Sequence, residues 1–149
     1  MKELPRILLA EDNRDDVELT LTALEEHNLA NAVDVVRDGV ETLDYLLRQG
    51  KFAGRDTGNP AVVLLDIKMP RIDGIEVLRR IRRDPKLKTI PVVMLTSSAM
   101  ESDIVESYGL GVNAYVVKPV DFTEFVTAVK HLGVFWALLN RTVVSDTGT

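Results

Sequence analysis

The segment Ala61-Val62-Val63-Leu64-Leu65-Asp66 contains five consecutive apolar residues and ends in a carboxylate. It consists mainly of valine and leucine, and its apolar character does not alternate from one residue to the next. Such a run is typical of a strand that is buried on both faces, as the strands of parallel sheets are. We therefore expect a central strand here, with Asp66 at its carboxyl end.

Four further segments have the same character, and stretches with helical spacing separate them. The other expected strands are Arg6–Ala10, Val33–Val36, Val92–Thr96 and Ala114–Val117. Elsewhere apolar residues recur every three or four positions, as at Val17, Leu21 and Leu24. Five strands that alternate with five helices predict an α/β fold, in which helices cover both faces of a doubly wound parallel sheet.

Local signals indicate where helices begin and where the chain loops. Three expected helix starts place a capping oxygen three residues before a glutamate, at Asp38, Ser98 and Asp121. The longest connection, Gln49–Pro60, is polar and contains glycine. We expect an exposed loop there.

Composition and charge limit the class of protein. The chain has 149 residues, of which 46% are apolar and 28% charged, as suits one folded domain. It has no cysteine and a net charge of −5, and no apolar run approaches the roughly 18 residues that cross a bilayer. Its start lacks the basic and apolar segments of a signal peptide. We therefore expect a cytoplasmic protein that binds neither nucleic acid nor membrane.

Polar side chains collect where the expected strands end. They are Glu11-Asp12 after the first strand, Asp66 on the third, Thr96-Ser97 on the fourth and Lys118-Pro119 after the fifth. Each alone has an ordinary explanation as a turn, a cap or a strand former. Parallel α/β sheets, however, bind ligands at this carboxyl edge. The joint occurrence therefore predicts one site.

Three carboxylates on one small edge repel one another. At about 4 Å and an effective dielectric near 20, each pair costs roughly 4 kcal/mol. Protonation would relieve the repulsion, and so would a divalent cation. Oxygen ligands without His or Cys favour Mg²⁺, for which Mn²⁺ can substitute, and Mg²⁺ leaves coordination positions for a phosphoryl group. A carboxylate can accept that group as an acyl phosphate, and we expect Asp66 to do so, with Lys118 and Thr96 contacting the phosphate.

Four motifs occur together along the chain. They are Ile7-Leu8-Leu9-Ala10-Glu11-Asp12, Leu64-Leu65-Asp66-Ile67-Lys68-Met69-Pro70 with Asp73-Gly74, Leu95-Thr96-Ser97, and Ala114-Tyr115-Val116-Val117-Lys118-Pro119. In this combination the chain resembles the receiver domains of two-component response regulators. The resemblance implies a flavodoxin-like (βα)5 fold with strand order 2-1-3-4-5. We expect a receiver domain over residues 5–138, a C-terminal tail over residues 139–149 and no output domain.

The resemblance gives roles to the residues around the phosphate. Asp66 matches the phosphoacceptor, and Thr96 and Lys118 match the residues that contact the phosphoryl group. Tyr115 matches the aromatic that moves inward when the threonine hydroxyl binds the phosphate. The bond between Lys118 and Pro119 is often cis in the family.

The resemblance also implies a metal site and two residues that affect the lifetime of the acyl phosphate. Asp12 and Asp66 match direct Mg²⁺ ligands, Glu11 an acid that acts through water, and the backbone carbonyl of Lys68 completes the ligands. The side chains of Lys68 and Ser98 occupy positions that set how fast the acyl phosphate hydrolyses.

Family members accept phosphate from a phosphohistidine on a sensor histidine kinase, and many accept it from small phosphodonors. We therefore expect a signalling protein rather than an enzyme, with only intrinsic self-phosphorylation and self-dephosphorylation. Its output would be a contact with a downstream protein or a phosphotransfer protein. The 49–60 loop and the aromatic C-terminal helix are similar to those of the response regulators that partner bacterial phytochromes.

The last expected helix carries more apolar surface than one core face needs. Its core stripe is Phe122, Phe125, Val126, Val129, Leu132 and Trp136, and the apolar residues beyond the stripe are Val134, Phe135, Leu138 and Leu139. These could cover the protein's own body, but we favour a homodimer. Neither His27 nor His131 resembles a phosphodonor, and we expect surface or packing roles for both.

Other functions are possible on such a sheet. A flavodoxin-like cofactor site would need a phosphate-binding turn after the first strand, where residues 11–16 are mostly acidic. A haloacid-dehalogenase-type hydrolase would need an acid two residues after the nucleophile, where Lys68 stands. A phosphorelay intermediate, or a receiver-like module that acts without phosphorylation, stays open as an alternative.

Overall fold

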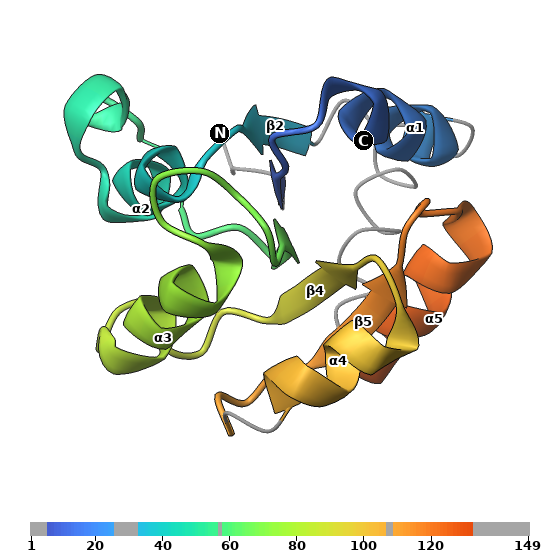
Figure 1. Ribbon diagram of the computed structural model, residues 1–149. Coiled ribbons are helices and arrows are strands. Elements are labelled where there is room, and N and C mark those ends of the chain that lie inside the picture. The colour runs from blue at the N-terminus through green and yellow to red at the C-terminus, as the bar shows by residue number, and fades with distance from the viewer. Residues whose placement is uncertain (1–5, 26–32, 57, 107–108, 133–149) are drawn as a thin grey trace.

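The computed structural model describes residues 6–25, 33–56, 58–106 and 109–132. Its five strands form one parallel sheet in the order β2-β1-β3-β4-β5, so the predicted fold class and strand order are confirmed (Figure 1). The strands are β1 Ile7–Ala10, β2 Val33–Val36, β3 Val62–Asp66, β4 Val92–Thr96 and β5 Ala114–Val117. Three match their predicted bounds, whereas β1 and β3 begin one residue later.

Helices connect the strands and cover both faces of the sheet (Figure 1). They are α1 Arg14–Glu25, α2 Gly39–Leu47, α3 Gly74–Arg83, α4 Ala99–Glu106 and α5 Phe122–Leu132, with a short 3-10 helix, η2, at Gly50–Phe52. Among the described residues, no helix has the length and apolar content to cross a membrane.

The sheet separates two hydrophobic cores. Leu8 packs with residues of α2, α3 and α4, whereas Leu9 packs with residues of α1 and α5. Successive residues of a strand point to opposite faces, so a strand with helices on both sides must be apolar throughout. All residues of β1, β3 and β4 are buried, but the edge strands β2 and β5 are partly exposed. The expectation of burial on both faces is therefore wrong for the two edges.

The edge strand β2 carries an acidic side chain that contacts α2 and the residue before β1. Asp34 accepts two hydrogen bonds of 2.8 Å from Arg6 and one from the Tyr45 hydroxyl on α2. The Arg55 guanidinium lies 4.1 Å from the centre of the Tyr45 ring and donates to the Tyr45 carbonyl. The 49–60 connection is thus mostly exposed, as expected, but η2 and Arg55 hold it against α2.

The three capping signals are confirmed. The Asp38 carboxylate accepts from the Glu41 backbone N–H at 2.7 Å. Ser98 and Asp121 accept in the same way from the backbone N–H groups three residues on, at 3.2 Å and 2.8 Å. Asp73 caps α3 in the same manner, and the sequence analysis did not single it out as a cap.

Part of the predicted C-terminal surface lies outside the described residues. On α5, Phe125 is buried, while Phe122 and Val126 are half-buried, as the core stripe requires. The structure gives no side-chain description of His27 and His131, of the core-stripe residues Val129, Leu132 and Trp136, of the further apolar residues Val134, Phe135, Leu138 and Leu139, or of the tail 139–149.

Candidate functional site

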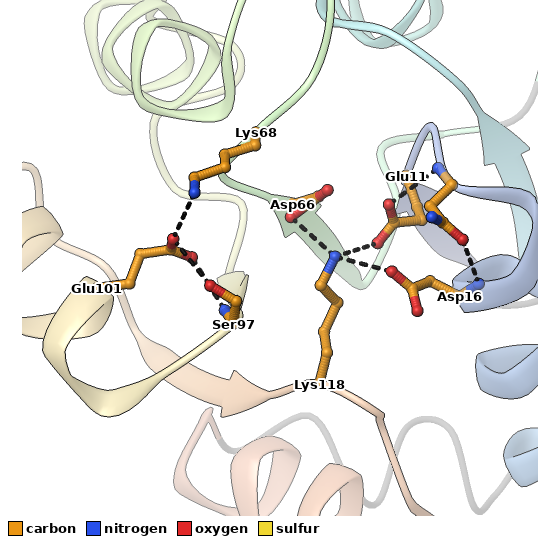
Figure 2. Close-up of polar contacts among 8 residues, drawn as sticks. Glu11, Asp16, Asp66, Lys68, Ser97, Glu101 and Lys118 are labelled. Carbon is orange, nitrogen blue, oxygen red and sulfur yellow. Dashed lines mark hydrogen bonds and ion pairs between the residues drawn. The ribbon is translucent and has the colours of Figure 1, made fainter.

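The carboxyl edge of the sheet gathers residues from four strands (Figure 2). Asp66 and Thr96 are the last residues of β3 and β4, and Glu11 and Lys118 directly follow β1 and β5. The parallel register places Asp66 opposite Leu95 and lets the Lys118 backbone N–H donate to the Thr96 carbonyl at 2.7 Å. The convergence expected from the sequence is present.

Lys118 lies between three acidic side chains (Figure 2). Its Nζ is 3.1 Å from Glu11 Oε1, 3.0 Å from Asp16 Oδ2 and 3.4 Å from Asp66 Oδ1. Burial lowers the pKa of Lys118, but the ion pairs, that with Asp16 first, more than offset this and raise it above the ordinary value. Lys118 is therefore a permanent cation here.

Asp16 is a member of this site that the sequence analysis missed. It lies in the first turn of α1, and its backbone N–H donates to the Asn13 side chain, which caps the helix. An acid in a first helical turn has an ordinary explanation in the helix dipole. Only the contact with Lys118, 102 residues away, gives it a second role.

Glu11, Asp12 and Asp66 form a compact acidic group. One carboxylate oxygen from each lies within 4.8 Å of the other two. Glu11 and Asp66 are 1% and 4% exposed, whereas Asp12 faces solvent. A set of carboxylate oxygens with one side open to water fits a hard divalent cation. The expected role of the Lys68 backbone carbonyl as a metal ligand stays a prediction.

Burial makes two of these acids hard to ionise together. It raises the pKa of Glu11 to about 7, with a further contribution from the neighbouring Asp66 carboxylate. Burial also raises the pKa of Asp66, although hydrogen bonds with Glu11 and the charge of Lys118 oppose the rise. Each ionised carboxylate thus disfavours ionisation of the other, and a bound cation would relieve this repulsion.

The segment that follows Asp66 is fixed by a glycine. The Gly74 backbone N–H donates to the Ile67 carbonyl at 2.8 Å, so the start of α3 packs directly on the end of β3. A Cβ at Gly74 would lie 2.1 Å from the Asp66 carbonyl oxygen. Asp73 therefore caps α3, and Gly74 permits the close approach of α3 to the end of β3.

Two further predicted residues lie on β4 and β5. Thr96 is fully buried at the end of β4, and Tyr115 is half-buried within β5, where it packs against the core beneath α2, α3 and α4. The inward movement of Tyr115, expected when the Thr96 hydroxyl binds the phosphate, stays a prediction. The peptide bond between Lys118 and Pro119 is cis, as the resemblance implied.

A second charged pair borders the site and joins the segment after β3 to α4 (Figure 2). The Lys68 Nζ lies 3.4 Å from Glu101 Oε2. The hydroxyl of Ser98, predicted to affect phosphate lifetime, accepts from the Glu101 backbone N–H and so caps α4. From the sequence alone, Glu101 was predicted only as part of a capping signal.

Comparison with known proteins agrees with this geometry. The family model described as response regulator receiver domain matches residues 7–130. Response regulator Rcp1 of Synechocystis sp. is 36% identical over 130 residues, which are 87% of this chain and 87% of Rcp1.

Solved structures include similar proteins. The bacteriophytochrome response regulator AtBRR is 59% identical, with a TM-score of 0.87 over 91% of this chain and 96% of AtBRR. The phosphorylated cyanobacterial phytochrome response regulator RcpA is 40% identical, with a TM-score of 0.71 over 90% and 94% of the two chains. The Mn²⁺-bound form of Rcp1 is 34% identical, with a TM-score of 0.68 over 89% and 95%. The family match and these identities show that the chain belongs to the response regulator receiver domains of two-component signalling.

Proposed function

We propose that this protein is a phosphorylation-controlled switch in which Asp66 accepts a phosphoryl group from a phosphohistidine on a sensor histidine kinase. The observation that carries the proposal is the position of Asp66. Its carboxylate lies at the carboxyl edge of the sheet, 3.4 Å from the Lys118 ammonium and beside Glu11 and Asp12.

The transfer needs one bond to form and one to break. An Asp66 carboxylate oxygen attacks phosphorus in line with the bond to the histidine nitrogen, and the electron pair of that bond returns to the imidazole. Lys118 supplies a fixed positive charge for the phosphoryl oxygens, and the Thr96 hydroxyl donates a hydrogen bond to one of them. Because Lys118 is already charged, its role requires no proton transfer.

The acidic group fits Mg²⁺, with Mn²⁺ as a substitute. Glu11, Asp12, Asp66 and the Lys68 carbonyl would hold the ion, which neutralises phosphoryl charge when bound. The donor set of carboxylate oxygens supports this, and so does the Mn²⁺-bound form of the related Rcp1. The phosphorylated state of the related RcpA supports the phosphoryl transfer.

The relatives suggest partners. Similarity to AtBRR, a bacteriophytochrome response regulator, supports a phytochrome-type histidine kinase as the phosphate donor. In our proposal, phosphorylation moves Tyr115 and alters the face formed by α4, β5 and α5, which then binds a downstream protein or a phosphotransfer protein.

The receiver domain would span residues 5–138, with the remaining tail outside it, and the apolar residues near its end would make a homodimer. Replacing Leu138 and Leu139 by Arg should shift sedimentation toward a monomer. A wild-type monomer at every concentration, in both phosphorylation states, would rule the dimer out.

The central test is mass spectrometry of the intact protein. With Mg²⁺ and acetyl phosphate, the wild type should gain about 80 Da, the mass of one HPO₃ group. Asp66→Asn should abolish the gain because an amide is not a nucleophile for phosphorus. The control is Asp56→Asn, which changes an exposed acid in the 49–60 connection. No gain in the wild type, or an undiminished gain in Asp66→Asn, would overturn the proposal.

A further inference from the structure

The pair formed by Lys68 and Glu101 lies beside the proposed phosphoryl site but takes no part in the acidic group. Lys68 follows Asp66 by two residues. Its side chain points toward α4 and away from the Asp66 and Lys118 cluster (Figure 2), and its Nζ is 3.4 Å from Glu101 Oε2. Among the described residues, Glu101 is the one acid within ion-pair distance of Lys68.

The two partners are held unequally. Glu101 Oε1 accepts from the Ser97 backbone N–H at 2.9 Å, and Oε2 accepts from the Ser97 hydroxyl at 3.0 Å. The side chain of Glu101 is 15% exposed, whereas that of Lys68 is 79% exposed. Glu101 is thus anchored on the first turn of α4, and Lys68, on its flexible four-carbon stem, is the partner that can move.

We propose that Glu101 is a positioning residue that holds the Lys68 ammonium away from the phosphoryl group and thereby sets the lifetime of the acyl phosphate. The inference rests on the proposed function, because it concerns the hydrolysis of the group carried by Asp66. It adds Glu101 to the residues that act on that group.

The hydrolysis explains why the position of Lys68 matters. Water attacks phosphorus on the side opposite the Asp66 oxygen, and the bond between phosphorus and that oxygen breaks. Its electron pair restores the Asp66 carboxylate, and the two protons of the water leave on dihydrogen phosphate. An ammonium group that pairs with the phosphoryl oxygens stabilises the acyl phosphate and occupies space that the water needs.

While Glu101 retains Lys68, the path of the water stays open and the acyl phosphate is short-lived. Loss of the Glu101 charge frees the ammonium to pair with the phosphoryl oxygens. The lifetime should then rise, and the rise should require the lysine.

The test uses Glu101→Gln on the full chain. A glutamine can still accept the hydrogen bond from the Ser97 backbone N–H, so the cap of α4 is kept while the charge is removed. The rate of acyl phosphate loss, measured by intact mass after removal of the phosphodonor, should fall about five-fold. In Lys68→Gln/Glu101→Gln the rate should equal that of Lys68→Gln alone.

The chain offers a matched control in α2. Glu41 accepts from the Arg37 backbone N–H at 3.2 Å, and its second oxygen pairs with Lys51 at 3.0 Å, so it has the same kind of cap and ion pair. Lys51 lies in η2 rather than beside Asp66. Glu41→Gln should therefore leave the lifetime unchanged, and circular dichroism should show that all variants are folded.

The outcomes separate the two proposals. A wild type that gains no phosphoryl group overturns both the proposed function and this inference. A phosphorylated wild type whose lifetime is unaltered in Glu101→Gln overturns the inference alone. So does a change in Glu101→Gln that persists in the double variant, because Lys68 would then be unnecessary.

Discussion

Lys118 is the counter-ion of the acidic site. Its contacts with Glu11, Asp16 and Asp66 join elements from both ends of the chain. One ammonium cannot neutralise three carboxylates, and burial together with the remaining repulsion from Asp66 raises the pKa of Glu11.

The stability of the metal-free protein should therefore fall as pH rises from about 4.5 to about 7. Glu11 has a higher pKa in the folded than in the unfolded state, so in this window the folded state binds more protons. The contribution of Glu11 to the free energy of unfolding is fully present below its pKa in the unfolded state. Up to about 3 kcal/mol is lost as the pH rises through its pKa in the folded state. Urea denaturation in the presence of a chelator measures it.

Glu11→Gln provides the control because glutamine does not ionise. Its free energy of unfolding should match that of the wild type near pH 5 and exceed it near pH 8 by up to about 3 kcal/mol. If the wild type instead gained stability relative to this variant as the pH rose from about 4.5 to about 7, Glu11 would be ionised in the metal-free fold.

At the scale of elements, the site depends on where helices begin. Gly39 and Gly74 are the first residues of α2 and α3, and a Cβ on either would overlap a backbone oxygen, at 1.9 Å for Gly39 and 2.1 Å for Gly74. The Gly39 contact is with Ile72, which lies between Asp66 and α3. These two close approaches hold the segment that presents Asp66.

Gly74→Ala should displace this segment, because the new Cβ would push the backbone at Gly74 away from that at Asp66 and so break the hydrogen bond between Gly74 and Ile67. We expect a loss of about 3 kcal/mol or more in the free energy of unfolding, together with slower phosphorylation by acetyl phosphate. Gly54→Ala is the matched control, since a Cβ there meets no atom within 4 Å. Equal stability of the two variants would contradict the claim that the close approach at Gly74 holds the segment that presents Asp66.

The elements were predictable to different degrees. Apolar runs gave the strands within one residue, because burial on both faces leaves an unbroken pattern. Asp34 was unremarked, since its partners Arg6 and Tyr45 come from other elements. Glu101 and Asp16 were assigned only local roles, or none, because a cap or a first-turn acid already accounts for them in sequence. Contacts between distant polar residues leave no periodic signal.

For the molecule as a whole, a bound cation should stabilise the fold. An ion that binds only the folded state adds about 2.7 kcal/mol to the free energy of unfolding at a hundred times its Kd. We expect Mg²⁺ to raise the urea midpoint of the wild type in this way. The effect should be greatest where Glu11 has lost its proton, above its pKa of about 7.

Asp12→Asn tests the origin of that gain. Asp12 is exposed, so the substitution should change metal-free stability by no more than about 0.5 kcal/mol. It should nevertheless remove most of the stabilisation by Mg²⁺, because an amide is a weaker ligand than a carboxylate. An equal gain in variant and wild type would place the ion elsewhere.

The hydrogen-bonded ion pair between Lys118 and Glu11 joins residues that are 107 positions apart. During synthesis, the acids near the start therefore leave the ribosome long before the lysine that neutralises them, and β5 must pair with β4 before the lysine can arrive. A nascent or truncated chain that lacks this last strand would carry Asp66 without its cation. In the proposed function, the ability to accept a phosphoryl group should therefore appear only when the domain is complete.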